Sequence, residues 1–259
     1  MPAPKTLKIY VTDHFNSQVV CKAIATGSGG QVVPASRLLD GPACVYGILR
    51  GCDQIIRECG WVGRDYYHVD HGYFRRGNGN FNGYYRITRN GLQVVGDGNK
   101  DAWLKNAPPS DRWDELKIEL KPWRRSGEEV VIAPLSKAVG QYLDIDPHKW
   151  LQAVIAEVRS HTDRPIVIKA KDSDASIQSS LRRAWCLVTH SSNSAIDAIV
   201  EGVPVFTTGD CASKFLASGP LSQIERPKYP DREKWFRVLA YSQWTMAEIQ
   251  RGRCWAWLT

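Results

Sequence analysis

The second half of the chain alternates short apolar runs with stretches of helical periodicity. The apolar runs cover residues 129–133, 165–169, 185–189 and 203–206, and each has the length of a buried strand. A helix is expected to begin at Asp146, a good N-cap residue, with Pro147 in its first turn, and two more are expected over 174–184 and 194–201. This order of strands and helices predicts a doubly wound α/β domain with a parallel sheet.

The first half carries similar patterns. Strands are expected over residues 7–12, 32–33, 44–49 and 65–70, and helices over 18–25 and 51–59. Glycine, asparagine and arginine dominate residues 75–99, which predicts loops and an antiparallel hairpin around 84–87 that turns at Asn90-Gly91. Proline and glycine interrupt 106–110 and 121–127. We therefore expect one α/β domain over residues 1–126 and a second over 127–259, which ends in two further helices.

Composition narrows the class of protein. The chain has 259 residues, and no apolar run approaches the roughly 20 residues that span a bilayer. The first residues have no apolar signal core, so we expect a cytoplasmic protein of a bacterium or a virus-infected cell. Seven cysteines, an odd number without a C-x-x-C pair, are expected to be reduced and buried rather than zinc ligands. The net charge of +7 favours a polyanionic or phosphate-bearing partner, although it also suits a merely basic surface.

The strongest chemical signal is the loop His190-Ser191-Ser192-Asn193-Ser194. It follows the strand expected over 185–189 and opens the next helix. In an open α/β sheet, ligands bind beyond the carboxyl ends of the strands, where hydroxyls and helix N–H groups suit a phosphate or diphosphate. The alternative is that one of the serines only caps the helix.

This segment resembles the donor-binding motif of GT-B glycosyltransferases. In that family a polar loop precedes a helix that closes with an acidic residue and Gly-x-Pro-Val, and here that closure is the run Glu201-Gly202-Val203-Pro204-Val205. The likeness is greatest to the capsule, sialyl and glycerophosphate-transferring types. It implies two Rossmann-like domains with a cleft between them: residues 1–126 on the acceptor side, and 127–259 binding a nucleotide-sugar, with terminal helices that cross back to brace the first domain.

The resemblance also implies roles for individual residues. The serines Ser191, Ser192 and Ser194 would hold the donor's diphosphate, and Asp197 or Glu201 would reach its ribose. Lys169 and Lys171 follow the strand expected over 165–169, where cations would offset the charge of the leaving group, unless they are only solvated surface lysines. The Arg-x-His-Pro form that these families carry at this place is absent.

A candidate base lies in the first half. The run Tyr67-His-Val-Asp-His-Gly-Tyr-Phe74 ends an expected strand, and Asp70 or His71 can take a proton from an acceptor hydroxyl. His71-Gly72 resembles a His-Gly pair of GT-B relatives. Alternatively, His68 and Asp70 form a structural hydrogen bond and His71 caps a turn. Asp13, at the end of the first strand, is the rival base.

Two other patterns carry less weight. Asp144-Ile-Asp146 and Asp172-Ser-Asp174 match the Asp-x-Asp metal motif of GT-A glycosyltransferases, but each precedes an expected helix, where aspartate caps the N-terminus. The run Gly27-Ser-Gly-Gly30 lacks the spacing of a dinucleotide loop. We therefore expect no metal and no cofactor other than a nucleotide-sugar co-substrate, with UDP as the expected nucleotide.

A basic stretch with interleaved aromatic residues suggests a polyanionic acceptor. Its basic members are Arg75, Arg76, Arg86, Arg89, Lys121, Arg124 and Arg125, interleaved with Tyr84, Tyr85 and Trp123. The residues expected to contact the acceptor are Arg75, Arg76, Arg86, Trp123 and Arg124. Such groups can grip a nucleic-acid backbone and stack on bases, although an ordinary basic loop has the same composition. Glycosyltransferases that decorate modified pyrimidines in viral DNA resemble this two-domain plan, which makes DNA one acceptor to consider beside a glycan.

Together these features predict a metal-independent glycosyltransferase that moves a sugar from a nucleotide-sugar to a hydroxyl of a glycan or of a modified base in DNA. The alternatives are a non-catalytic α/β module that binds nucleotides or nucleic acid, and a nucleotide-sugar epimerase.

Overall fold

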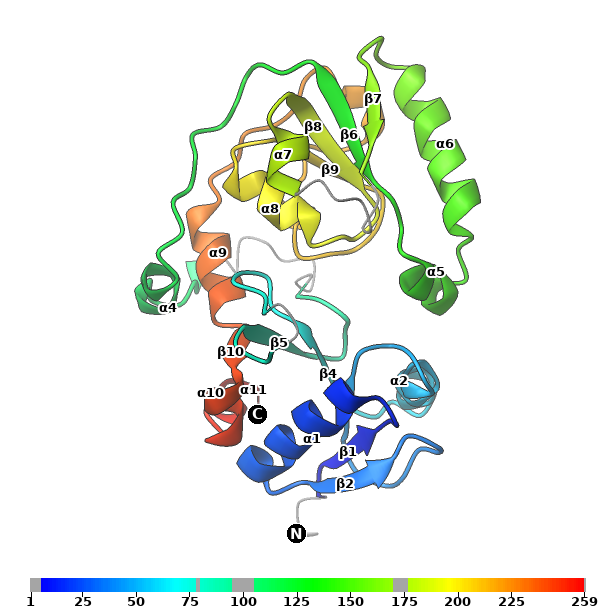
Figure 1. The fold of residues 1–259 in the computed structure, drawn as a ribbon, viewed down its shortest axis with the longest axis vertical. Coiled ribbons are helices and arrows are strands. Elements are labelled where there is room, and N and C mark those ends of the chain that lie inside the picture. The colour runs from blue at the N-terminus through cyan, green and yellow to red at the C-terminus, as the bar shows by residue number, and fades with distance from the viewer. Residues whose placement is uncertain (1–5, 78–79, 95–104, 170–176, 259) are drawn as a thin grey trace. The chain divides into compact units, whose positions relative to one another are not determined.

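The computed structural model describes residues 6–77, 80–94, 105–169 and 177–258. The chain forms two compact units, which are described separately. Unit 1 comprises residues 1–94 and 239–259, and unit 2 comprises residues 95–238. Figure 1 shows the helices and strands of both.

Unit 1 is built on a six-stranded sheet with the order β10-β5-β4-β3-β1-β2. Its strands are β1 (Lys8–Val11), β2 (Gln31–Pro34), β3 (Ala43–Tyr46), β4 (Tyr66–His71), β5 (Tyr84–Arg89) and β10 (Gln243–Thr245). Strands β1 to β4 pair in parallel, whereas β5 is antiparallel to both β4 and β10. The carboxyl ends of the four parallel strands therefore meet at one edge, which we call the unit 1 edge.

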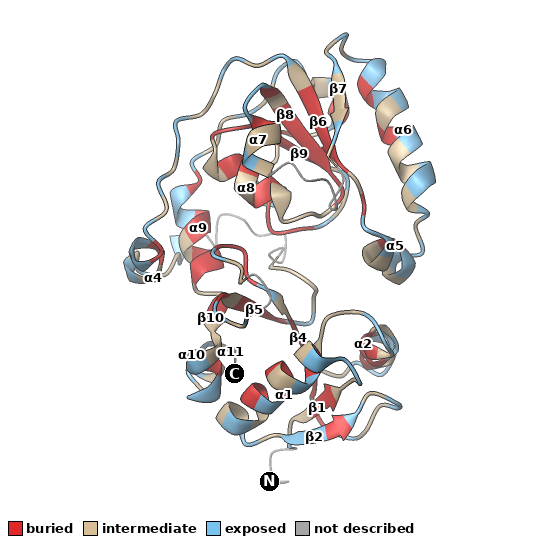
Figure 2. Cartoon of the chain, in the orientation of Figure 1, coloured by how far each residue is buried: buried red, intermediate tan, exposed pale blue. Residues whose placement is uncertain are grey.

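Helices cover the sheet of unit 1 because each presents an apolar stripe. Helix α1 (Phe15–Ser28) buries Ser17, Val20, Cys21 and Ile24, which are spaced as one helical face. These residues pack in a core with strands β1, β3, β4 and β5 and with α10 (Met246–Gln250). Helix α2 (Cys52–Trp61) packs against β3 and also buries one apolar face. Figure 2 shows the buried strands of this sheet beside the exposed outer faces of its helices.

The compact units divide the chain differently from the expected boundary at residue 126. The last 21 residues belong to unit 1, since β10 pairs with β5 and α10 packs on α1. The chain leaves unit 1 after Val94, well before the proline- and glycine-rich segment at 121–127. That segment lies within unit 2, where Lys121 and Arg124 donate backbone hydrogen bonds to Val200 and Gly202.

Unit 2 contains a four-stranded parallel sheet with the order β7-β6-β8-β9. Its strands are β6 (Glu129–Ala133), β7 (Ile166–Ile168), β8 (Ala184–Thr189) and β9 (Val205–Thr207). Its helices are α4 (Asp111–Glu115), α5 (Lys137–Leu143), α6 (Pro147–Arg159), α7 (Ile177–Leu181), α8 (Ser194–Val200) and α9 (Glu233–Ala240). The last two residues of α9 belong to unit 1. Two short 3₁₀ turns cover Lys214–Leu216 and Leu221–Gln223. The carboxyl ends of its strands form what we call the unit 2 edge.

The predicted α/β class, with parallel sheets flanked by helices, is confirmed. Helix α6 begins as expected, with Pro147 in its first turn and with the Asp146 carboxylate accepting hydrogen bonds from the backbone N–H groups of His148 and Lys149. Val154 and Val158 of this helix pack on the residues of β6, β8 and β9 that face it. The other face of the sheet carries α7 and α8 (Figure 1).

Three features differ from the expected elements. Strand β5 pairs with the preceding β4. Among the described residues that follow the turn at Asn90-Gly91, up to Val94, there is no strand. Helix α5 was not expected from the sequence, because its seven residues are too few to show a helical period of apolar positions. Strand β10 lies between the two expected C-terminal helices, followed by α10 and α11 (Trp255–Leu258), because Gln243 and Trp244 complete the sheet of unit 1.

All seven cysteines are free and buried, as predicted. Burial raises the pKa of several of these thiols, to about 11 for Cys21 and about 12 for Cys52. Within the described residues, none of the helices combines the length and the apolar character required to cross a bilayer.

Candidate functional site

The Ser-rich loop lies at the unit 2 edge, where the sequence places it. Strand β8 ends at Thr189, which is level with Ala133 of β6 and Thr207 of β9. The Thr189 hydroxyl donates to the carbonyl of Ala133 at 2.9 Å, and the Thr208 N–H donates to the carbonyl of Thr189 at 3.0 Å. The loops that follow three neighbouring strands are therefore tied together at one place, as a ligand site in an open α/β sheet requires.

His190 is held inside this edge rather than on its surface. Only 8% of the residue is exposed, and its Nδ1 lies 3.0 Å from the hydroxyl of Thr208. Trp150 of α6 donates its indole N–H to the same hydroxyl at 2.9 Å, and its ring stands edge-on to the imidazole. Gly209 packs so closely that a Cβ there would overlap the His190 ring. His190 thus joins α6 to the loops after β8 and β9.

Two of the three loop serines contact each other. The Ser194 hydroxyl donates to Ser192 Oγ at 2.9 Å, and the Ser194 backbone N–H donates to the same oxygen at 3.2 Å. Because Ser192 Oγ already accepts twice, its own proton is directed elsewhere and can be donated to a ligand. Ser191 is half-buried beside them, and Asp197 lies one turn into α8.

The acidic residue that closes α8 has a partner within unit 2. Glu201 forms an ion pair with Lys121, and its side chain is 20% exposed. The following Gly202 has a φ of +76°, and a Cβ at this position would overlap the carbonyl oxygen of Pro122. Geometry therefore explains the glycine of the Glu-Gly-x-Pro-Val sequence, which ends the helix in a left-handed conformation against a neighbouring loop.

Gly202→Ala is expected to destabilise unit 2 by about 2–5 kcal/mol, from about 1–2 kcal/mol of left-handed backbone strain and a further overlap cost of about 1–3 kcal/mol. Gly29→Ala is the matched control, because Gly29 has a similar φ of +67° with nothing within 4 Å of its Cβ position. Its expected cost is about 1–2 kcal/mol. Denaturant unfolding of both variants measures the difference, and equal losses would refute the proposed overlap.

Of the two candidate lysines, only Lys169 lies within the described residues. It follows β7 and donates its backbone N–H to the carbonyl of Ile132 at 2.9 Å, so its half-buried side chain starts at the unit 2 edge. Lys171 falls in the segment 170–176, outside the described residues, as do Asp172 and Asp174.

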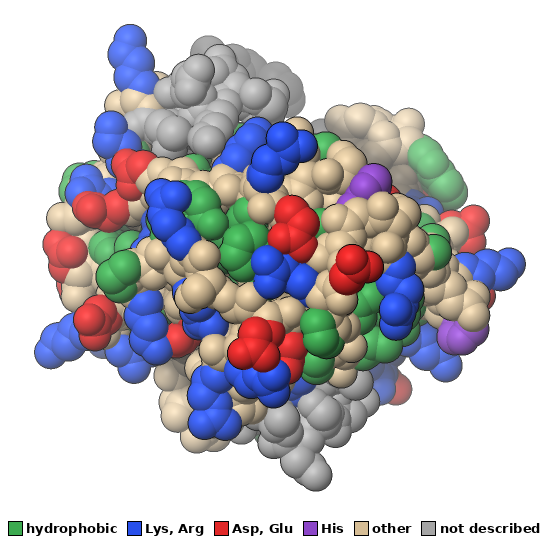
Figure 3. Space-filling model, turned by 90° about the horizontal axis from the view of Figure 1, so that it is seen from above, with side chains coloured by type: hydrophobic (Ala, Val, Ile, Leu, Met, Phe, Trp, Pro, Cys, Tyr) green, Lys and Arg blue, Asp and Glu red, His purple; other side chains and the backbone are tan. Residues whose placement is uncertain are grey.

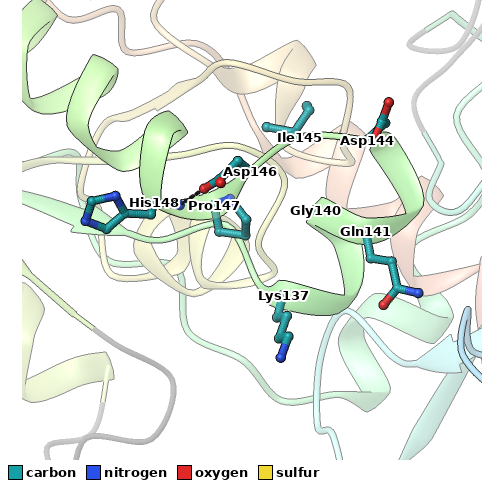
Figure 4. Close-up of a pocket in the computed structure, with 8 residues that line it drawn as sticks. All are labelled: Lys137, Gly140, Gln141, Asp144, Ile145, Asp146, Pro147 and His148. Carbon is teal, nitrogen blue, oxygen red and sulfur yellow. Dashed lines mark hydrogen bonds between the residues drawn. The ribbon is translucent and has the colours of Figure 1, made fainter.

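A groove of about 610 Å³ lies between α5 and the start of α6 (Figure 4). Asp144 and Asp146, which match an Asp-x-Asp pattern, both line this groove. Asp144 is the C-cap residue of α5, with a φ of +57°, and the Asp146 side chain caps the N-terminus of α6. In the described part of the chain, no three His, Cys, Asp or Glu side chains gather as a metal site would require.

Asp70 is the residue before the last of β4, at the unit 1 edge, and two hydrogen bonds hold its carboxylate. Its Oδ2 accepts from the Arg86 guanidinium at 2.6 Å, and its Oδ1 accepts from the backbone N–H of His71 at 2.8 Å. Burial raises the pKa of Asp70, but the charge of Arg86 and these neighbours outweigh it, so the pKa lies below its usual value. The carboxyl group is therefore ionised at neutral pH, and 35% of the side chain remains exposed.

The two rivals of Asp70 lie at the same edge. His71 is exposed and stacks on Tyr85, with ring centroids 6.1 Å apart. Asp13 follows β1, is 88% exposed and pairs with Arg50 at 3.3 Å. Gly72, the second member of the His-Gly pair, has no room for a Cβ, which would lie 2.8 Å from the side chain of Gln243 and 2.9 Å from Tyr84.

Sequence reasoning missed Tyr46, which ends β3 beside Asp70. Burial and the charge of Asp70 raise the pKa of Tyr46 to about 12, against a hydrogen bond with Asn16. Its ring lies 6.3 Å from that of Tyr85. The available signal was its position at the end of a parallel strand. It was missed because the strand was expected to continue over 44–49, which would have placed Tyr46 in the middle of it.

His68 lies two residues before Asp70 in β4, and its side chain is buried in the interior. It is 1% exposed, its Nδ1 lies 3.2 Å from the Leu92 carbonyl, and its Nε2 has no hydrogen-bond partner among the described residues. Burial lowers the pKa of His68 to about 4, in spite of the nearby Asp70. The predicted alternative of a direct His68–Asp70 hydrogen bond is therefore not what orients this ring.

Acid is expected to destabilise unit 1 through His68. Its folded-state pKa lies below the unfolded value near 6.5, so the unfolded chain binds the proton first, and stability falls as the pH drops from about 6.5 to 4, by about 3 kcal/mol in all. Denaturant unfolding at several pH values measures this slope. His68→Asn keeps a donor for Leu92 and is expected to flatten it; an unchanged slope in that variant would assign the effect to other groups.

The residues of the basic stretch have intramolecular partners. Arg86 is 6% exposed and donates to the His71 carbonyl at 2.8 Å as well as to Asp70. In unit 2, Arg124 donates to the carbonyls of Leu181 and Arg182. Trp123 donates its indole N–H to the carbonyl of Pro230, and the Arg232 guanidinium lies over its ring. Arg75 and Arg76 lie in the loop after β4. On the face drawn in Figure 3, basic and acidic side chains are interspersed.

No protein-family model and no curated protein matches the chain. Solved structures with a similar fold include two from KpsC of Thermosulfurimonas dismutans. The β-Kdo 2,7-transferase is 13% identical, with a TM-score of 0.55 over 97% of this chain and 99% of that one. The β-Kdo 2,4-transferase is 12% identical, with a TM-score of 0.51 over 90% of each chain. The chain therefore has the α/β fold of these GT-B glycosyltransferases.

Proposed function

We propose that this protein is a glycosyltransferase that moves a sugar from a nucleotide-sugar donor to an acceptor hydroxyl. The observation that carries the proposal is the coincidence of fold and chemistry. The fold of the chain aligns with those of two sugar transferases over 90% and 97% of its length. Its hydroxyl-rich loop lies at the edge where an open α/β sheet binds ligands.

Unit 2 is the proposed donor domain. Ser192 can donate its proton to a phosphate oxygen, with Ser191 and Ser194 beside it, while His190 fixes the shape of the loop. We propose Lys169 and Lys171 as the cations that offset the charge of the leaving phosphate. Asp197 remains the candidate for the ribose, and Glu201 would have to exchange its ion pair with Lys121 to reach it.

Unit 1 is the proposed acceptor domain, with Asp70 as the group that takes the proton. An ionised carboxylate is required for that task, and Arg86 maintains it. Asp70 is preferred to Asp13 because Arg86 and the backbone N–H of His71 fix its geometry, whereas Asp13 is almost fully exposed. His71 stays a candidate, because it is adjacent and accessible.

A panel of UDP-, GDP- and CMP-linked sugars tests the proposal. It includes CMP-linked Kdo, since the structural neighbours are Kdo transferases. At least one donor is expected to raise the melting temperature at millimolar concentration, and mass spectrometry is expected to find sugar added to a glycan or a DNA acceptor. Release of free nucleotide or an isomerised sugar without acceptor consumption would instead favour an epimerase, and salt-sensitive DNA binding without turnover would favour a non-catalytic module.

Metal removal is a separate prediction. We propose that side chains alone stabilise the leaving group, so dialysis against EDTA is expected to leave the turnover rate unchanged. Loss of turnover that Mg²⁺ or Mn²⁺ restores would overturn the metal-independent proposal without affecting the assignment as a transferase.

A further inference from the structure

An aromatic pair of one exposed and one half-buried phenylalanine lies at the unit 1 edge. Phe15, the first residue of α1, is 66% exposed, although phenylalanine is usually buried. Its ring stands edge-to-face against Phe81, with centroids 5.9 Å apart. The buried stripe of α1 includes Ser17 and Val20, and a residue two positions before Ser17 lies on the opposite side of the helix. The outward face of Phe15 is therefore set by the helix and is available for stacking.

The backbone around this pair is held in an unfavourable conformation. Phe81 has a φ of +60°, and Arg50 and Arg75, in the loops that follow β3 and β4, have φ values of +57° and +49°. Left-handed conformations disfavour residues with a Cβ, and they persist where surrounding structure imposes them, often at functional sites. Three such residues gather in the loops of one sheet edge. The loop of Phe81 is also pinned, since Gly77 and Gly83 approach too closely for a side chain on either.

Side-chain interactions of Tyr46 connect the start of α1 to the proposed base. Asn16, the neighbour of Phe15, forms a hydrogen bond with Tyr46, and the charge of Asp70 acts on the same tyrosine. A group stacked on Phe15 would therefore lie beside the residues that end β3 and β4.

The charges at this edge indicate what the group would be. Asp13 pairs with Arg50 and Asp70 pairs with Arg86, and Arg75 and Arg76 lie in the loop after β4. Carboxylates beside an aromatic ring suit a sugar, because its hydroxyls donate hydrogen bonds and its C–H face packs on the ring.

We propose that Phe15 and Phe81 form a stacking subsite for a sugar ring of a carbohydrate acceptor. The inference rests on the proposed transferase function and specifies its acceptor class, with Asp13 and Asp70 accepting hydrogen bonds from the sugar's hydroxyls.

The test is direct binding of a glycan library to the full chain without donor, followed by titration of the best ligand. Phe15→Ala is expected to weaken that glycan about tenfold, and Phe15→Trp is expected to retain it. Trp61→Ala is the matched control: Trp61 is 79% exposed in the same unit, but it ends α2 near the start of β4, at the opposite edge of the sheet. That variant is expected to bind like the unmodified chain.

Equal binding by Phe15→Ala, or binding of single-stranded DNA in place of every glycan, would overturn the subsite. Because the assay contains no donor, its failure is distinct from failure of the donor titration, which tests the transferase proposal itself. Under turnover, Phe15→Ala is also expected to raise the acceptor KM while leaving the donor KM and kcat unchanged, and a general loss of kcat would contradict a role confined to acceptor binding.

Discussion

Asp70→Asn is expected to reduce turnover by about 10²–10⁴-fold, the usual contribution of a general base, and to leave donor affinity unchanged. The substitution keeps the size of the side chain and its contact with the N–H of His71, but it removes the charge that accepts a proton. Arg86 retains its bonds to the carbonyls of His71 and Leu92, so the fold is expected to persist. Steady-state kinetics with saturating donor measures the effect, and the melting temperature verifies folding.

Asp13→Asn is the matched control, because Asp13 is a carboxylate at the same edge with an arginine partner. It is expected to keep most of its kcat at saturating acceptor, and to raise the acceptor KM because its carboxylate is proposed to bind a sugar hydroxyl. The reverse result, with Asp70→Asn active and Asp13→Asn inactive, would transfer the role to Asp13. The pH profile supplies a second criterion: since the pKa of Asp70 lies below its usual value, the acid limb of kcat is expected below about pH 4, whereas an imidazole base would place it near 6.5.

Ser192→Ala is expected to weaken donor binding by about 10- to 150-fold, because a hydrogen bond to a charged phosphate contributes about 1.5–3 kcal/mol. Ser192 is chosen since its oxygen accepts from both the N–H and the hydroxyl of Ser194, which directs its proton outward. Adding Lys171→Ala is expected to weaken binding further. Isothermal titration with the donor found in the panel measures both changes.

Ser160→Ala serves as the control for Ser192, because Ser160 is an exposed serine of the same unit whose hydroxyl donates to the Glu157 carbonyl at the far end of α6. It is expected to bind donor normally. Donor affinity that is unchanged in Ser192→Ala would remove this hydroxyl from the site.

The sequence predicted the sheet of unit 2 well, because its signals are local. The apolar run over 129–133 matches β6, and Asp146 and Pro147 begin α6 as expected. The organisation of the domains was harder to predict, because it depends on pairing between distant segments. Trp244 in β10 lies opposite Tyr85 in β5, and the residues around Trp244 in the sequence do not predict this pairing.

The candidate site shows the same limit. Strand ends are readable, so Asp70 and the Ser-rich loop were found at sheet edges. The roles of charged side chains depend on what surrounds them in space. From the sequence, Arg86 was interpreted as a surface cation of a basic stretch. The register between β4 and β5 places it opposite Asp70, where its guanidinium is buried. Phe15 and Phe81 are 66 residues apart, and their contact follows only from the fold.

The central claim is that the Ser-rich loop of unit 2 binds a sugar donor. Isothermal titration of the unmodified chain with UDP-, GDP- and CMP-linked sugars tests it most directly. We predict saturable binding of at least one donor with a Kd at or below about 1 mM, or roughly 4 kcal/mol of binding free energy, and its loss in Ser192→Ala. Absence of binding by every donor at millimolar concentration, with the protein folded, would contradict the account.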